Sequence, residues 1–228
     1  MTLGIVTLLS RPHEIDRLGE MFARARRLTR RRVFRLVVCD WSLANRVSIP
    51  WADSILDLDD GLKLWQRYER VRRFIAGPWI IDAPRHWSFV DDDDIIAETH
   101  FVELDLRSTY FARGADQVLL TDGKRMELHS VPSPVAAWTQ AAWSRDVFRE
   151  VPFVDSPAPD TRFMLDAVQT YGAEIQRSGP VTYACRIHPG NTRARFKGEG
   201  VPLTCEALPP ALRGEYERIR AWAEVSGP

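Results

Sequence analysis

Four consecutive carboxylates are the part of this sequence with the most evident chemistry. Asp91, Asp92, Asp93 and Asp94 directly follow a short apolar run, residues 87–90. Adjacent carboxylates repel one another, and a divalent cation would remove that repulsion. A group of oxygen ligands suits Mg²⁺ or Mn²⁺ better than zinc. An isolated acidic run is equally typical of a solvated turn, so the rest of the chain has to decide between a metal site and a turn.

The apolar run before the carboxylates predicts a buried strand, because it is short and rich in aromatic and β-branched residues. If that strand continues through the acidic residues, Asp91 and Asp93 point to one face and can share a metal with its ligand. Asp92 and Asp94 then face the other way and are not expected to bind the metal directly.

The elements that must position these carboxylates follow from the hydrophobic pattern. Residues 4–9 and 33–39 are continuous apolar runs, and apolar residues recur at helical spacing in 15–25 between them. A strand, a helix and a strand in this order predict a βαβ unit and hence a parallel sheet. Ligands bind such sheets at the carboxyl ends of the strands. The positions at those ends are residues 7–11, 40–42 and 91–94.

The remaining pattern predicts one α/β domain over residues 1–200 and a C-terminal helical extension over residues 201–228. Its expected elements are a strand at 55–58, a helix at 64–75, a mainly helical segment at 95–113, a hairpin around 122–123, a short helix at 145–150, a helix capped by Asp160, a strand at 181–187 and a helix at 212–223.

The bulk composition excludes several classes of protein. Acidic and basic residues number 31 each, so the net charge gives no bias toward nucleic acid or a membrane surface. No apolar run approaches the roughly 20 residues that span a bilayer. Residues 1–6 enter a strand-like run without a basic leader, which is not typical of a signal peptide. Three scattered cysteines form no disulfide framework, so we expect a cytoplasmic protein.

Three motifs in a fixed order resemble the inverting glycosyltransferases of the large family 2 type, which have the GT-A fold. The first is an Asp-x-Asp at a strand end, residues 89–93. The second, residues 145–163, joins Arg-x-x-Phe, a Phe-x-Asp piece and an Asp at the start of a helix. The third, residues 183–192, is a strand that ends in a His-x-Gly-Asn type of turn. The resemblance covers roughly residues 3–195.

This resemblance implies a single GT-A-like domain: a Rossmann-like, mostly parallel sheet flanked by helices, with a small antiparallel part and a C-terminal helix. It implies transfer of a sugar from a nucleotide-sugar donor, UDP-linked by expectation, to an acceptor hydroxyl by single displacement with inversion. The resemblance also implies that Mn²⁺ or Mg²⁺ assists the leaving group. It does not identify the acceptor: a saccharide is one candidate, and a modified DNA base is the alternative that an arginine-rich segment, residues 24–35, would suit.

The resemblance also assigns roles to residues of this chain. Asp160 is the general base, with Asp155 in reserve. Asp93 is the more direct metal ligand, Asp91 contacts the ribose or the metal, and His188 completes the metal site or touches the diphosphate. The expected nucleotide-sugar contacts are Thr7, Arg11, Asp40, Asp91 and Asp92, and Arg193 and Arg195 are further candidates for phosphate.

Other interpretations stay open at this point. Seven arginines crowd into residues 24–35, either as a solvated helix end or as a patch for an anionic polymer. A non-catalytic anion-binding or nucleic-acid-binding module would use that patch. A sugar-nucleotide pyrophosphorylase would need glycines that residues 8–12 lack, and a two-metal phosphoesterase would need carboxylates from several strands. Trp138 and Trp143 either pack in the core or stack on an acceptor.

Overall fold

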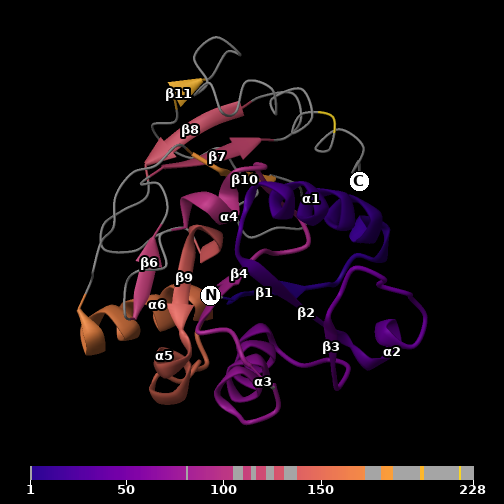
Figure 1. Cartoon of the computed structure of the whole chain (residues 1–228). Helices are drawn as coiled ribbons and strands as arrows, with labels where there is room; N and C mark the ends of the chain where they lie inside the picture. Colours follow the sequence, from indigo (N-terminus) through magenta and orange to yellow (C-terminus); the bar gives the residue numbers. More distant parts are fainter. Residues whose placement is uncertain are drawn as a thin grey trace.

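The part of the chain that the structure describes forms two sheets, and helices cover the larger one on both faces (Figure 1). This computed structural model describes residues 2–80, 82–104, 110–113, 117–121, 126–130, 138–172, 181–186, 201–202 and 221. Within this part of the chain, no helix is long and apolar enough to cross a membrane.

The larger sheet has the strand order β3-β2-β1-β4-β9-β6. Its strands are β1 (Thr2–Leu8), β2 (Arg32–Asp40), β3 (Ser54–Leu58), β4 (His86–Phe89), β6 (Phe111–Arg113) and β9 (Ala141–Ser144). Strand β1 pairs in parallel with β2 and β4, and β2 pairs in parallel with β3. Strand β9 runs antiparallel to both of its neighbours. The predicted parallel sheet with a small antiparallel part is therefore confirmed.

Successive residues of the central strands pack alternately into two separate cores. Ile5 and Val37 belong to one core, whereas Val6 and Leu36 belong to the other. Because successive strand residues point to opposite faces, the two cores lie on opposite sides of the sheet. Gly4 faces Trp87 across the β1–β4 pair, and a Cβ at this glycine would lie 2.3 Å from the indole ring.

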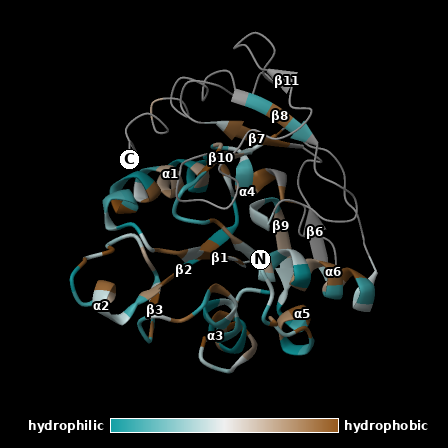
Figure 2. Ribbon diagram, turned by 180° about the vertical axis from the view of Figure 1, so that it is seen from behind, coloured by the Kyte–Doolittle hydropathy of each residue, from teal (hydrophilic) through white to brown (hydrophobic). Residues whose placement is uncertain are grey.

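Two groups of helices fill these cores. Helix α1 (Ile15–Leu28) buries one face in the first core, and α3 (Leu64–Ala76) and α6 (Pro159–Tyr171) bury theirs in the second. Brown and teal segments alternate along α1 in Figure 2, as expected of an amphipathic helix. The shorter helices are η1 (Pro12–Glu14), α2 (Trp41–Ala44), α4 (His100–Glu103), η2 (Trp138–Gln140) and α5 (Arg145–Glu150).

The smaller sheet has the order β11-β8-β7-β10-β5. Its strands are β5 (Asp94–Ile96), β7 (Gln117–Thr121), β8 (Met126–Ser130), β10 (Tyr183–Arg186) and β11 (Val201–Pro202). The antiparallel β7–β8 pair confirms the two strands of the predicted hairpin, and its turn at residues 122–125 lies outside the described residues. Strand β5 begins at the last aspartate of the acidic run, so this run lies where the chain passes from the larger sheet to the smaller one.

Three of the sequence predictions are wrong. The acidic run does not continue the strand, because β4 ends at Phe89 and a turn follows. The segment 95–113 is not mainly helical, since β5 pairs with the distant β10 and α4 has only four residues. Asp160 is not the cap of α6: the cap is Ala158, and Asp160 lies in the first turn. The helix expected at 212–223 lies outside the described residues apart from residue 221.

Candidate active site

The acidic run is a tight turn at the carboxyl end of β4. The Val90 amide donates a hydrogen bond to the Val6 carbonyl (2.9 Å), which keeps the ends of β1 and β4 side by side. The Asp94 amide then donates to the Asp91 carbonyl (3.1 Å) and closes the turn. Carboxylates that were predicted to alternate along a strand are therefore placed by the turn instead.

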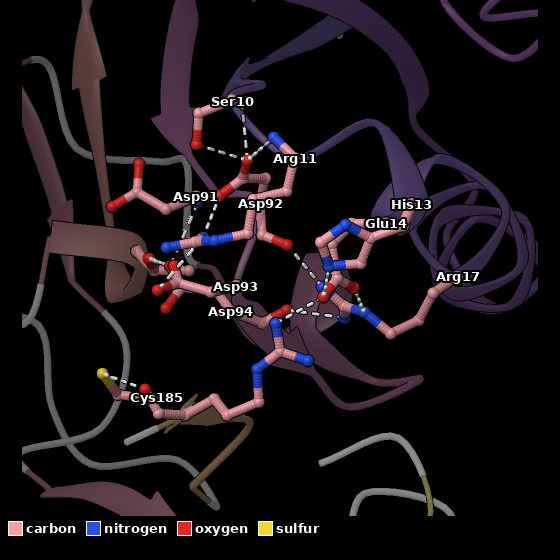
Figure 3. A network of polar contacts seen from close by, with 12 residues as sticks. Ser10, Arg11, His13, Glu14, Arg17, Asp91, Asp92, Asp93, Asp94 and Cys185 are labelled. Carbon is pink, nitrogen blue, oxygen red and sulfur yellow. Dashed lines mark hydrogen bonds and ion pairs between the residues drawn. The ribbon is translucent and has the colours of Figure 1, made fainter. Parts of the chain in front are cut away.

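Asp92 joins this turn to the loop that follows β1. Its Oδ2 accepts hydrogen bonds from the amides of Ser10 (2.6 Å) and Arg11 (2.8 Å) and from the Ser10 hydroxyl (2.8 Å). Its Oδ1 accepts one from Arg11 Nη1 (2.5 Å). Figure 3 shows Ser10 and Arg11 meeting Asp92, whereas Asp91 points away from that group. The carboxylate of Asp92, a predicted nucleotide-sugar contact, is thus engaged within the fold.

Asp94 fastens the other end of the turn. It is buried and accepts hydrogen bonds from Tyr183 of β10 (2.8 Å), from Thr139 of η2 (2.7 Å) and from the Asp91 amide (3.0 Å). Burial and the charge of Asp93 raise the pKa of Asp94 to about 7. Asp92 and Asp94 therefore both serve the fold, which leaves Asp91 and Asp93 as the candidates for a ligand.

Asp91 and Asp93 lie at a cavity of about 380 Å³. The end of β1, the start of α3 and the acidic turn form its wall. Its lining residues are Leu8, Ser10, Arg11, Leu62, Leu64, Arg67, Tyr68, Asp91, Asp92 and Asp93. Arg11 Nη1 is 3.4 Å from Asp93 Oδ2, so the cavity holds a guanidinium beside its carboxylates. Such a mixture can bind an anionic group and a cation together.

The environment of Asp91 fits a cation. Its Oδ1 is buried and has no hydrogen-bond partner within the described residues. Burial raises the pKa of Asp91 well above its usual value, and the charges of Asp94 and Asp93 raise it further. No group of three His, Cys, Asp or Glu side chains in the described part of the chain forms a complete metal site. Mg²⁺ is, however, commonly held by one or two carboxylates together with substrate phosphates, and Asp91 and Asp93 match that pattern.

A second polar group lies at the end of β2, next to Arg67 of the cavity wall. Arg67 Nη2 donates to Asp40 Oδ2 (2.8 Å), while Asp40 Oδ1 is buried and lacks a partner among the described residues. Tyr68, next to Arg67 on α3, is buried, and burial together with the charges of Asp91 and Asp160 raises its pKa. The sequence pattern predicts Tyr68 only as an apolar position of a helix, and it contains no signal that distinguishes Arg67 from the other arginines of this helix.

The other expected site residues are placed less centrally. Thr7 is buried in β1 and does not line the cavity. Asp160 lies in the first turn of α6, where its charge helps to raise the pKa of Asp91. Asp155 is mostly exposed and pairs with Lys63 (3.7 Å). His188 and its neighbours Arg193 and Arg195 lie outside the described residues.

Both tryptophans that were candidates for stacking on an acceptor are core residues. Trp138 lies 4.5 Å from Phe89 between ring centroids, and Trp143 lies 5.6 Å from Phe163. Their exposed fractions are 6% and 1%, so the core-packing interpretation holds for both.

The arginine-rich segment is only partly a surface patch. Arg31 donates to the carbonyls of Phe101 (2.8 Å) and Leu104 (2.6 Å), and Arg35 pairs with Asp53 (2.9 Å). Arg24 pairs with Glu98 (3.4 Å). The exposed members of the segment are Arg26, Arg27, Arg30 and Arg32.

Comparison with solved structures identifies the fold of this chain. No protein-family model and no curated protein sequence matches the chain. Among solved structures, TarS from S. aureus is 13% identical with a TM-score of 0.53, over 83% of this chain and 37% of that one. The catalytic domain of Drosophila β1,4-galactosyltransferase 7, in complex with xylobiose, is 11% identical with a TM-score of 0.51, over 95% of this chain and 79% of that one.

A third similar structure is the mannosyltransferase PcManGT from Pyrobaculum calidifontis in complex with GDP-Man and Mn²⁺. It is 13% identical with a TM-score of 0.51, over 99% of this chain and 70% of that one. The chain thus spans little more than a third of TarS but most of the other two. At these identities the likeness shows the fold, and this chain has a GT-A-like α/β fold.

Proposed function

We propose that this protein is a metal-dependent glycosyltransferase that moves a sugar from a nucleotide-sugar donor to an acceptor hydroxyl. The nucleotide we expect in the donor is UDP. The observation that carries the proposal is the acidic turn. Two of its aspartates are engaged in the fold, and the other two, Asp91 and Asp93, lie together at a cavity at the strand ends of a GT-A-like sheet. The structures of TarS with UDP and of PcManGT with GDP-Man and Mn²⁺ support it, because they combine this fold with such ligands.

The donor would occupy the cavity at the acidic turn and extend past Arg67 to Asp40 at the end of β2. The unpartnered Oδ1 of Asp40 is suited to accept an N–H of the nucleotide base, with Arg67 holding the other oxygen. Asp91 and Asp93 would hold Mn²⁺ or Mg²⁺ together with the diphosphate, and Arg11 would add a second positive charge beside it.

The reaction is a single displacement at the anomeric carbon. The acceptor oxygen forms its bond to this carbon from one face while the bond to the diphosphate oxygen breaks on the other, so the configuration inverts. A divalent cation bound at the turn would supply Lewis-acid stabilisation of the leaving diphosphate. Asp160 takes the proton of the acceptor hydroxyl as general base, a role for which it must come within hydrogen-bond reach.

The exposed arginines favour a second candidate acceptor. Arg26, Arg27, Arg30 and Arg32 offer four cations on one segment, which suits the backbone of a nucleic acid. Under this alternative, the enzyme glycosylates a modified base instead of a saccharide. The protein could instead be a non-catalytic module that binds through the same arginines. That alternative gives no function to the cavity or to the carboxylate oxygens that lack hydrogen-bond partners.

A thermal-shift experiment tests the proposal directly. We expect UDP or GDP to raise the unfolding temperature in Mn²⁺ and to have little effect in EDTA. A ligand at a hundred times its Kd stabilises by about 2.7 kcal/mol, which corresponds to a shift of about 5–10 °C for a chain of this size. A screen of sugar nucleotides for hydrolysis in Mn²⁺ would then identify the sugar. The absence of a metal-dependent shift with every nucleotide would refute the proposal.

A further inference from the structure

The backbone of the acidic turn rests on a buried arginine of α1. Arg17 Nη2 donates to the Asp92 carbonyl (2.6 Å), and Arg17 Nη1 donates to the Asp94 carbonyl (2.9 Å). These two carbonyls flank Asp93 in the chain, so one guanidinium fixes the backbone on both sides of this residue. Figure 3 shows Arg17 on the opposite side of the turn from Ser10.

Arg17 is itself held by a second buried contact. Its Nε donates to Glu14 Oε2, and Arg186 Nη2 donates to Glu14 Oε1 (2.5 Å). The exposed fractions of the side chains are 9% for Arg17, 2% for Glu14 and 4% for Arg186. Burial opposes ionisation of Glu14, but hydrogen bonds and charges from Arg17 and Arg186 outweigh it and lower the pKa of Glu14 to about 2. The three residues therefore carry one net positive charge beneath the turn.

We propose that Arg17 is a positioning residue for the metal-binding carboxylates, and that Glu14 and Arg186 lock its guanidinium in place. The inference rests on the proposed function, because that function makes Asp91 and Asp93, the groups that Arg17 would position, the ligands of a cation. Only a planar guanidinium can donate to both carbonyls and to Glu14 at once; a lysine keeps the charge but cannot reach all three acceptors. Loss of a residue that orients a metal ligand without touching the metal typically weakens metal binding by about 10–100-fold.

Charge and geometry predict opposite effects at this position. As a positive charge near the site, Arg17 repels a cation, and its removal would tighten Mn²⁺ binding. As a positioning group, it fixes Asp93, and its removal would weaken Mn²⁺ binding. The sign of the change in Arg17→Gln therefore separates the two roles, and Arg17→Lys tests geometry alone because it keeps the charge.

The experiment measures Mn²⁺ affinity by electron paramagnetic resonance in the presence of UDP. We expect Arg17→Lys and Arg17→Gln each to weaken Mn²⁺ binding about tenfold or more. Arg24→Lys is the matched control, because Arg24 lies on the same helix and pairs with Glu98 away from the turn; it should stay within about twofold of the wild type. Glu14→Gln keeps Arg17 but loosens its anchor, and serves as the second variant if the Arg17 variants fail to fold. Because it adds one net positive charge, which by itself weakens Mn²⁺ binding, its readout is the backbone exchange of the turn and not Mn²⁺ affinity.

Hydrogen exchange of the backbone provides a readout that needs no metal. We expect the amides of residues 91–94 to exchange at least about tenfold faster in Arg17→Lys than in the wild type or in Arg24→Lys. Unchanged exchange in Arg17→Lys, or tighter Mn²⁺ binding in Arg17→Gln, overturns the inference. If the wild type binds no Mn²⁺ with UDP, the proposed function fails, and the exchange rates alone still decide whether Arg17 holds the turn.

Discussion

The acidic run and the arginine run are equally conspicuous in the sequence, but the fold treats them differently. Three of the seven arginines make contacts within the fold, and the exposed ones, Arg26, Arg27, Arg30 and Arg32, point into solvent. Asp92 and Asp94 also make hydrogen bonds within the fold, but Asp91, Asp92 and Asp93 line a cavity at the end of β4. The acidic run has four charges in four residues and the arginine run has seven in twelve, and of the two runs only the acidic one lines this cavity.

The difference has an energetic side. An exposed arginine is well solvated and costs the fold little. The buried Oδ1 of Asp91 has no partner within the described residues, and burial and neighbouring charges raise the pKa of this carboxyl. A fold keeps such an unfavourable group at a functional site more often than elsewhere. An unexplained electrostatic cost is thus a better guide to function here than a run of like charges.

The strongest test of this comparison is to neutralise Asp91 or Asp93. We expect Asp91→Asn and Asp93→Asn each to weaken Mn²⁺-dependent UDP binding by about 100-fold or more, because a ligand of the cation is lost. Asp91→Asn should also raise the unfolding temperature of the metal-free protein, since it removes a buried and repelled charge. Calorimetric titration and thermal unfolding measure the two effects.

Asp59→Asn is the matched control for these variants. Asp59 is 81% exposed and does not line the cavity, so both binding and unfolding temperature should stay as in the wild type. Full metal-dependent binding in Asp91→Asn and Asp93→Asn would remove the distinction between the two charged runs.

Asp160 should separate binding from chemistry. We expect Asp160→Ala to bind Mn²⁺ and UDP normally but to transfer sugar about 10²–10⁴-fold more slowly, because the general base is gone. Asp155→Ala is the comparison, as Asp155 is the reserve candidate and lies exposed beside Lys63. Transfer assays with the donor found in the sugar-nucleotide screen measure both. Undiminished transfer by Asp160→Ala, with a loss in Asp155→Ala, would exchange the two assignments.

The sequence predicted the parts of this arrangement that depend on local pattern. Buried strands, the helices between them and the strand end at Asp40 follow from apolar periodicity, and the structure confirms these elements. The strand before the acidic run is also confirmed, although β4 ends at Phe89. It did not predict that β5 leaves the larger sheet, because β5 pairs with β10, whose residues lie almost ninety positions further along the chain. Such pairing overrides local preference.

The same limit applies within the site. The separation of Asp92 and Asp94 from Asp91 and Asp93 was expected from strand alternation, yet contacts with Ser10, Thr139 and Tyr183 produce it. None of these partners is near the run in sequence. Periodicity also shows which face of a helix is buried but not what that face meets, so it could not reveal that Arg67 and Tyr68 reach the cavity.

A substitution of Asp92 tests whether this aspartate stabilises the fold. We expect Asp92→Ala to lower the free energy of unfolding by about 3 kcal/mol, because Arg11 and the Ser10 amide lose a buried charged partner. Asp146→Ala serves as the control: its ion pair with Arg149 is about half exposed and should contribute less than about 0.5 kcal/mol. Urea unfolding measures both variants. Equal stability of the two would show that Asp92 is not a structural residue.

The smallest effects are expected in the arginine run. Replacing Arg26, Arg27, Arg30 and Arg32 together by Gln should change Mn²⁺-dependent UDP binding by less than about twofold and stability by less than about 1 kcal/mol, because surface substitutions have small effects. Binding to duplex DNA, measured by fluorescence anisotropy at several salt concentrations, should be equally weak in the variant and the wild type. If the four arginines instead neutralise four phosphates, the logarithm of the wild-type binding constant falls with that of salt with a slope of about −3.6. A slope of that size that disappears in the variant would make the arginine run a second functional surface and would favour a nucleic-acid acceptor over a saccharide.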